Sequence, residues 1–467
     1  MSVKKESLSL LSLPVDVIRH AIFPLLEFKL LVSLDSALCE TSQRNHYNNC
    51  LHGHLCETYY WMYSTISQWV RDRGMKISSA ELTAAMDTEH ILQFRSLYCS
   101  LKSIKLFTPI EEAAFSLFCS CIEVNSLVEI SIYAMDKTWD EKILRIVLSR
   151  QSSLRKVTLK ATSVVTDQTV LWIASHCPLL EYISLDCGLA KLDISVVKVL
   201  LSSCKHLCDI HVSGNAVSNE ILQVFATHCK LFKGLGLSSC GSIDDAGLRT
   251  ALRLCEQLES LTIHSCPQIT AAGIAVCGRH CTRLTNSSFD GFVLNSVLLP
   301  FFAHTKGITQ LRGPLCSDLV LRGAVHWRDL ISIDLFKSDL VDAAVDSLAR
   351  NCVCLQQLFL ADCLLLTNAS MVSLGRYAQS LEVLFITNDG QISDDGIVAL
   401  CTGCPKLRIF YVKVNTHVTY VGAVAVARRI HDRKYWGFSL CQNVSSHDSY
   451  CAWLKAYNER IAPYFGV

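Results

Sequence analysis

Residues 204–228 read CKHLCDIHVSGNAVSNEILQVFATH, residues 229–254 read CKLFKGLGLSSCGSIDDAGLRTALRL, and residues 255–280 read CEQLESLTIHSCPQITAAGIAVCGRH. These consecutive segments have 25, 26 and 26 residues, and each begins with a cysteine. An apolar residue follows each cysteine by three, six and eight places, at Leu207, Ile210 and Val212, at Phe232, Leu235 and Leu237, and at Leu258, Leu261 and Ile263. The sequence therefore contains a repeated unit of fixed length.

The spacing inside one unit predicts a short strand followed by a helix. The last two apolar residues are two places apart, so they face the same side of a strand, and the residue between them faces the other side. Turn and N-cap residues such as Ile243-Asp244-Asp245 come next, followed by apolar residues at helical spacing. A period of about 20–29 residues with this apolar core is typical of leucine-rich repeats. We therefore predict an α/β solenoid, a leucine-rich-repeat horseshoe with parallel strands on the concave face and helices on the convex face.

A single unit is too small to be stable. Burying about six apolar side chains contributes roughly 1.5–3 kcal/mol each, whereas ordering costs roughly 1–2 kcal/mol for every residue. Stacking on neighbouring units closes this difference. The pattern continues in both directions and predicts a solenoid of about thirteen units over residues 98–427. It weakens near Leu284 and Leu311, where Pro300 and Pro314 indicate a looser or differently curved section.

Many of the 24 cysteines recur at two positions of the repeat. The first position is held by Cys177, Cys204, Cys229, Cys255, Cys281, Cys352 and Cys404, and the second by Cys187, Cys240, Cys266 and Cys363. A reduced cysteine behaves as a small buried hydrophobe, and a reducing compartment keeps it so. Cys401 and Cys404 form a C-x-x-C, but zinc needs four ligands and no second pair has a suitable spacing. We therefore expect core cysteines, no metal and no cofactor.

Bulk properties exclude several classes of partner. The formal net charge is +1 and 18% of residues are charged, which argues against a nucleic acid or an anionic membrane held mainly by electrostatics. Asp16 and Arg19 interrupt the first apolar stretch, so we expect neither a secretory signal nor a transmembrane span of ~20 residues. The sequence has no glycine-rich phosphate loop, H-E-x-x-H or G-x-S-x-G. We expect a non-catalytic protein of the cytoplasm or nucleus.

The cysteine-ended form of the repeat, CPLLEYISLDC from Cys177 to Cys187, points to a particular family. It resembles the cysteine-containing leucine-rich repeats of the F-box and leucine-rich-repeat proteins. The likeness covers roughly three quarters of the chain. It indicates the fold strongly and the function weakly, because solenoids of this kind bind many unrelated partners.

Residues 10–50 precede the repeats and show apolar residues at helical spacing. This segment resembles an F-box, with matches at Leu13, Pro14, Ile18, Phe23, Leu26, Leu31, Leu34 and Cys39, although the tryptophan usual after the cysteine is missing. The resemblance implies a small all-α head that docks on the Skp-type adaptor of a cullin-RING ubiquitin ligase. By the same resemblance, the adaptor-binding residues are Leu13, Pro14, Ile18 and Leu31. The alternative is a cap that only seals the first repeat.

The two ends of the repeat array are predicted to be closed by other structures. Residues 51–97 are expected to form a helical linker or N-terminal cap, including a helix from Ser79 to Phe94. Residues 428–467 are rich in aromatic residues such as Trp436 and Trp453 and are expected to form a C-terminal cap.

The outward-facing residues of the strands change abruptly late in the chain. The middle outward position is small or polar as far as Asp334, and three aromatic residues follow. Exposed aromatic patches of this kind mark interaction sites. A register shifted by one residue, or a C-terminal tail folded over these positions, would instead make them core. The predicted substrate-binding surface comprises Phe336, Phe359, Val383, Phe385, Ile409 and Tyr411.

These observations predict a substrate-recognition subunit of a cullin-RING ubiquitin ligase. The N-terminal helices would bind the Skp-type adaptor, the solenoid would bind a protein substrate, and other subunits would transfer ubiquitin through enforced proximity. Outside that complex we expect a monomer. His211 and His264 also face outward but lie in separate repeats, so we expect no metal or catalytic role for them. The alternative is a leucine-rich-repeat scaffold without a ligase, whose N-terminus is only a cap.

Overall fold

Strands alternate with helices along the chain in the computed structural model, as the apolar spacing requires. The structure describes residues 55–57, 72, 76–82, 88–93, 95–107, 112–133, 141–160, 165–186, 192–214, 217–229, 231–291, 294–387, 391–413, 415, 417–430, 436–439 and 441. They belong to two compact units, Met1–Ile210 and His211–Val467. The predicted head at residues 10–50 lies outside the described residues.

In the first unit, each described strand pairs in parallel with the next one along the chain. These strands are β1 (Leu55–Glu57), β2 (Lys76–Leu82), β3 (Ser103–Leu106), β4 (Glu129–Ile132), β5 (Lys156–Leu159) and β6 (Tyr182–Asp186). Strand β7 (Asp209–Ser213) crosses the boundary between the two units. The inward residues Ile104 and Leu106 are buried, whereas the alternate residues Ser103 and Lys105 are half-buried.

In the second unit, the strands from β8 onward pair in parallel in sequence order. They are β8 (Gly234–Ser238), β9 (Ser260–His264), β10 (Asn286–Asp290), β11 (Gln310–Gly313), β12 (Ser332–Phe336), β13 (Gln357–Ala361), β14 (Val383–Thr387), β15 (Ile409–Lys413) and β16 (Trp436–Ser439). Most have the alternating burial expected when one face is packed on helices and the other is open.

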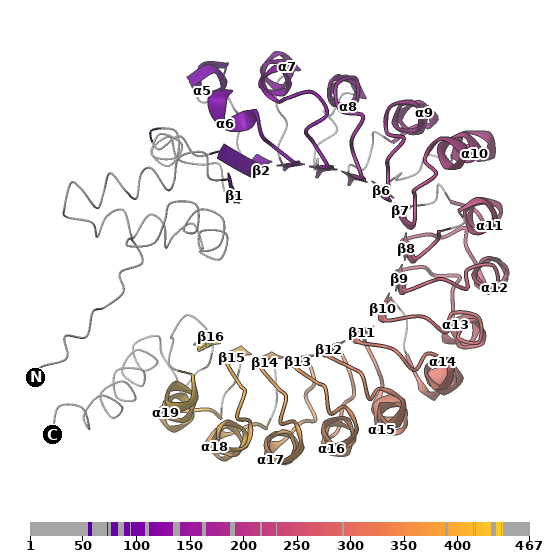
Figure 1. Cartoon of the computed structure of the whole chain (residues 1–467). Helices are drawn as coiled ribbons and strands as arrows, with labels where there is room; N and C mark the ends of the chain where they lie inside the picture. Colours follow the sequence, from indigo (N-terminus) through magenta and orange to yellow (C-terminus); the bar gives the residue numbers. More distant parts are fainter. Residues whose placement is uncertain are drawn as a thin grey trace, which may run out of the picture. The chain divides into compact units, whose positions relative to one another are not determined.

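Helices follow the strands and cover one side of each unit, while the strands line the other side (Figure 1). In the first unit they are α5 (Thr88–Gln93), α6 (Arg95–Tyr98), α7 (Glu112–Cys121), α8 (Glu141–Leu148), α9 (Asp167–His176) and α10 (Ile194–Ser203). In the second they are α11 (Asn219–His228), α12 (Asp245–Leu252), α13 (Ala271–Cys277), α14 (Leu299–His304), α15 (Ser317–Gly323), α16 (Asp342–Asn351), α17 (Asn368–Tyr377), α18 (Asp394–Gly403) and α19 (Tyr420–Arg429). Among the described helices, none combines the length and the apolar character needed to span a membrane.

The chain thus folds as leucine-rich repeats, which confirms the predicted fold class. The repeated cysteines that the structure describes lie in the core, as predicted: Cys204, Cys255 and Cys352 are each 2% exposed or less. The Cys204 thiol donates to the Cys177 carbonyl of the preceding repeat, at 3.2 Å. Burial raises the pKa of the Cys204 thiol to about 12, so this side chain is a protonated, unreactive core group.

The weak middle of the array keeps regular strand pairing. Strands β10 and β11 pair in parallel, so the predicted loosening is not seen between them. Aromatic side chains are part of the core here, because Phe289, Phe301, Phe302 and Trp327 are all fully buried. Their rings meet edge to face at 5.9, 5.2 and 5.0 Å along the series. Large aromatic rings therefore supply buried apolar area in units where the L-x-x-L-x-L pattern is incomplete.

Both predicted caps contain strands of the repeat sheet. The helix predicted from Ser79 to Phe94 is wrong at its start, because residues Lys76–Leu82 form β2 and pair with β3. In the predicted C-terminal cap, residues Trp436–Ser439 form β16 and pair with β15. At β2, backbone pairing with the neighbouring strand overrides the local helical spacing.

The first residue of six described helices hydrogen-bonds to the N-cap residue of the next described helix. We call these contacts the N1 bridges; they start from Asp167, Asn219, Asp245, Asp342, Asn368 and Asp394. The Asp394 carboxylate accepts from the Thr419 backbone N–H at 2.8 Å, from its hydroxyl at 2.5 Å and from the Gly422 N–H at 2.9 Å. Each such bridge satisfies helix-terminal donors that would otherwise lack partners.

Candidate protein-binding surface

The middle outward position of the late strands forms a continuous row. Strand pairing aligns Asp334 with Phe359, Phe359 with Phe385, Phe385 with Tyr411, and Tyr411 with Gly437. We call Phe359, Phe385 and Tyr411 the aromatic ladder. Parallel pairing brings these residues together although they lie 26 residues apart in sequence.

The three rings of the aromatic ladder are stacked on one another. The Phe359 and Phe385 ring centroids are 5.2 Å apart, those of Phe385 and Tyr411 are 5.0 Å apart, and both pairs have an interplanar angle of 21°. All three side chains are half-buried, whereas the adjacent Leu384 and Phe410 are 0% exposed. The predicted register therefore holds. Because Phe359 and Tyr411 stack on the two faces of the Phe385 ring, its edge is the part left uncovered by the ladder.

The ladder has a defined end on each side. At one end Asp334 forms an ion pair with Arg312, with 3.0 Å between Nε and Oδ2, and burial raises the pKa of the Asp334 carboxyl despite the opposing effect of Arg312. At the other end the row continues with Gly437, where an added Cβ would lie 3.2 Å from the Tyr411 ring. The row therefore has three aromatic steps between an ion pair and a residue without a side chain.

The neighbouring outward row is less exposed than the sequence predicts. Val383 is 6% exposed and belongs to the core, which corrects its assignment to the open surface. In the sheet, Val383 pairs with Gln357 on one neighbouring strand and with Ile409 on the other. The shorter valine is thus flanked on both sides by residues with longer side chains. Ile409 is half-buried, as are the ladder residues.

Phe336 lies beside the aromatic ladder but is not a step of it. It pairs with Ala361, two residues further along the strand than Phe359. Its ring is covered by the Arg312 guanidinium, 5.6 Å from the centroid. This cation–π contact ties Phe336 to the ion pair at the end of the row.

Among the described residues, an unpaired positive charge lies next to the ladder. Arg312 forms an ion pair with Asp334, and Arg408 forms one with Glu382 at 2.7 Å. Lys413 follows Tyr411 by two places on the same face, and its exposed side chain has no carboxylate within ion-pair distance among the described residues. The ladder is thus an apolar strip with a cation beside one end.

The strand face of the first unit has a different character, which sequence reasoning missed. Lys105 pairs with Glu81 at 2.8 Å and Lys156 with Glu129 at 3.0 Å. Phe107 and Tyr133 stack at 4.8 Å with an interplanar angle of 6°. The signal was present in the sequence, because Phe107 directly follows the inward Leu106 at the end of a strand.

His211 and His264 lie on different strands, β7 and β9, and have different surroundings. His264 Nε2 lies 2.8 Å from the Ser288 hydroxyl, and burial lowers the pKa of His264, although Asp290 opposes the shift. The His211 ring lies over Gly236, where an added Cβ would be 1.9 Å from Nδ1. Within the described parts of the chain, no three His, Cys, Asp or Glu side chains gather as metal ligands would.

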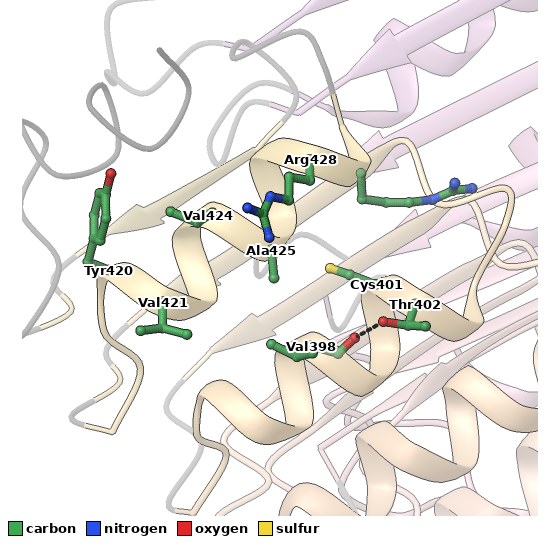
Figure 2. A pocket seen from close by; sticks show the side chains of 9 residues that line it. Val398, Cys401, Thr402, Tyr420, Val421, Val424, Ala425 and Arg428 are labelled. Atoms are coloured by element: carbon green, nitrogen blue, oxygen red, sulfur yellow. Dashed lines mark hydrogen bonds between the residues drawn. The ribbon is translucent and has the colours of Figure 1, made fainter. Parts of the chain in front are cut away.

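A hollow of about 440 Å³ lies on the helical side between α18 and α19. Figure 2 shows Val398, Cys401 and Thr402 on one helix, facing Tyr420, Val421, Val424, Ala425 and Arg428 on the next. The Thr402 hydroxyl donates to the Val398 carbonyl at 2.8 Å and is satisfied within its own helix. The sequence spacing of these residues predicts two helices but gives no sign of a hollow, because the space depends on how the two helices pack.

The predicted adaptor-binding residues lie outside the described residues; they are Leu13, Pro14, Ile18 and Leu31. Their role therefore stays a prediction from the sequence.

No protein-family model matches the chain, and no curated protein matches it. Similar solved structures include the Rad7 and Elc1 complex of yeast, at 17% identity over 70% of this chain and 83% of that chain, with a TM-score of 0.44. Another is the TLR13–ssRNA13 complex, at 13% identity over 74% of this chain and 59% of that chain, with a TM-score of 0.45.

Proposed function

We propose that this chain is the substrate-recognition subunit of a cullin-RING ubiquitin ligase. The observation that carries the proposal is the order of two parts: an F-box-like segment with Leu13, Pro14 and Ile18 stands in front of cysteine-ended leucine-rich repeats. The head binds the Skp-type adaptor, and the strand face of the repeats binds a protein substrate. Ubiquitin transfer belongs to other subunits, which act on a substrate held nearby.

The aromatic ladder supports a binding role rather than chemistry in this chain. Its three steps offer apolar ring edges, and the carboxylate next to them, Asp334, is occupied by Arg312. Clustered aromatic side chains are typical of protein–protein contact sites. We propose that the ladder is the centre of the substrate surface and that the chain itself is non-catalytic.

Co-purification with a Skp-type adaptor tests the proposal. The full chain is compared with a variant lacking residues 1–55, with the double variant Pro14→Ala, Ile18→Ala, and with Phe385→Ala as the matched control. We expect a one-to-one complex with the full chain and with Phe385→Ala, and none with the two head variants. If the full chain forms no complex, the ligase proposal is wrong.

The second candidate function is a leucine-rich-repeat scaffold whose N-terminus is a cap. The pairing of β1 and β2 in front of β3 favours it, because the preceding residues would then cover the open edge of the sheet. Fusing residues 1–55 to an unrelated protein separates the two functions. Adaptor binding by the fusion supports the ligase subunit, and its absence supports the scaffold.

A further inference from the structure

We infer that the aromatic ladder binds an amphipathic α-helix of the substrate, lying along the row of rings with one apolar side chain on each. This inference rests on the proposed function, because it names the kind of substrate that the same surface takes. It is carried by the spacing of Phe359, Phe385 and Tyr411 and by the charge next to them.

The spacing of the rings matches the repeat of a helix. Successive centroids are 5.2 and 5.0 Å apart, so the outer rings are separated by about 10 Å. In an α-helix, residues i and i+7 lie about 10.5 Å apart along the axis, with i+3 or i+4 between them. A helix therefore places three side chains on the three rings without bending or shifting.

An extended segment does not match. Residues on the same side of a β-strand are about 6.6–6.8 Å apart, so three of them span about 13 Å. The third side chain would pass the Tyr411 ring and reach Gly437, which has no side chain to contact. The ladder thus distinguishes a helix from a strand by length alone.

The orientation of the rings indicates which side chains it takes. Because Phe359 and Tyr411 cover the two faces of Phe385, the edge of the Phe385 ring is what a partner meets. Ring edges carry partial positive charge and attract the face of an aromatic ring in a T-shaped contact. We therefore expect an aromatic residue at the middle of the helix and aliphatic residues before and after it.

The charge next to the ladder adds a second requirement. The exposed ammonium group of Lys413 has no carboxylate partner among the described residues, while the neighbouring Arg408 is already paired with Glu382. An acidic residue on the flank of the helix would pair with Lys413 on binding. This complementarity predicts an acidic amphipathic helix whose binding weakens as salt is added.

A set of defined peptides tests this inference on the full chain. The first probe is a lactam-bridged helical peptide of about 18 residues, with Leu, Phe and Leu at i, i+4 and i+7 and glutamates on the flanks. The second has the same composition with the apolar residues scattered around the helix. The third places the same three residues at alternate positions of a cyclic β-hairpin. Binding is measured by fluorescence anisotropy at low and high salt.

We expect the first probe to bind at least about tenfold more tightly than either of the others. Phe385→Ala should weaken it at least about tenfold, Phe385→Leu less, and Lys413→Ala should reduce its salt dependence. Phe107→Ala changes an exposed stacked ring of the first unit and should have no effect. Thermal melting shows that each variant is folded.

Three results would overturn the inference: equal binding of the first two probes, preference for the hairpin, or a first probe insensitive to Phe385→Ala. The comparison of the three peptides uses the unaltered chain, so it tests the inference even if a variant is unstable. Adaptor co-purification from the same preparation separates the two proposals. If the chain binds the adaptor but not the helical peptide, the ligase proposal stands and the substrate binds elsewhere. If the chain binds the helical peptide but not the adaptor, the chain is a scaffold that uses this ladder.

Discussion

At the scale of single residues, the aromatic ladder differs from the core beneath it in what each side chain should contribute to stability. Phe385 is half-buried and contacts two stacked rings, while Phe410 is 0% exposed. Phe385→Ala should lower the free energy of unfolding by about 1–2 kcal/mol, since a stacked pair contributes about 0.5–1.5 kcal/mol. Phe410→Ala should cost about 3–5 kcal/mol because it leaves a cavity. Urea denaturation measures both, and equal losses would show that Phe385 is core.

A second residue-scale prediction concerns acid. Burial alone would raise the pKa of Asp342, but hydrogen bonds from Ser370 and Thr367 outweigh it and the pKa is lowered. A carboxyl whose pKa is lower in the folded state stabilises the fold above its unfolded pKa of about 4, and this contribution is lost as the pH falls. We expect Asp342→Asn to be less stable at pH 7 and to lose less stability between pH 7 and pH 3 than the unaltered chain.

The control for this experiment is Asp395→Asn, which changes an exposed aspartate on α18. Stability is followed by thermal melting at each pH. If Asp342→Asn and Asp395→Asn show the same pH dependence, the bridge from Asp342 does not favour the charged carboxylate.

At the scale of elements, four of the six N1 bridges place their side-chain oxygen against a glycine at the third position of the next helix. An added Cβ at Gly422 would lie 2.6 Å from the Asp394 Oδ1, and Gly247 and Gly273 face the same kind of contact. Glycine to alanine in a helix normally stabilises by about 0.5–1 kcal/mol. Here we expect Gly422→Ala to destabilise by about 1–3 kcal/mol, since the carboxylate is held by three hydrogen bonds.

A double-variant cycle identifies the cause. Asp394→Ala alone should also destabilise, because the Thr419 and Gly422 donors lose their acceptor. With Asp394→Ala in place, Gly422→Ala should cost much less, or stabilise, because the clash is removed. Costs that simply add in the double variant would rule out this contact as the reason for glycine.

At the scale of the whole molecule, stacking of the repeats should protect the repeated cysteines as a set. Cys352 is 1% exposed, and burial raises the pKa of its thiol to about 12, whereas Cys354 is exposed. Alkylation of the native protein should modify Cys354 on the order of a hundredfold or more faster than Cys352, with the difference lost in denaturant. Peptide mass spectrometry measures the alkylation rate of both thiols, which lie only two residues apart in the sequence. Comparable native rates would show that the repeats around Cys352 open readily.

Much of the fold and part of the candidate site could be predicted because their causes are local. Alternation along a strand places Leu384 inward and Phe385 outward, whatever the rest of the chain does. The repeat period then sets Phe359, Phe385 and Tyr411 side by side, since parallel strands in successive units pair in register. Local spacing and one period are therefore sufficient for the three-ring row.

The rest could not be predicted because it depends on neighbours across strands and helices. Val383 is buried although alternation along its strand places it outward, and Phe336 contacts Arg312 instead of joining the row. Local spacing predicted a helix from Ser79, whereas the structure pairs this segment with β3 as strand β2.

By itself, the sequence determined that this protein is an array of leucine-rich repeats, which side of each strand faces the core, and that aromatic residues gather on its late strands. Only the tertiary structure decided that three of those rings stack at helical spacing, that a glycine and an ion pair bound them, and that the N1 bridges link the helices. The physical reason is that inward and outward directions follow from alternation within one strand, whereas burial, stacking and hydrogen bonding depend on side chains from neighbouring repeats.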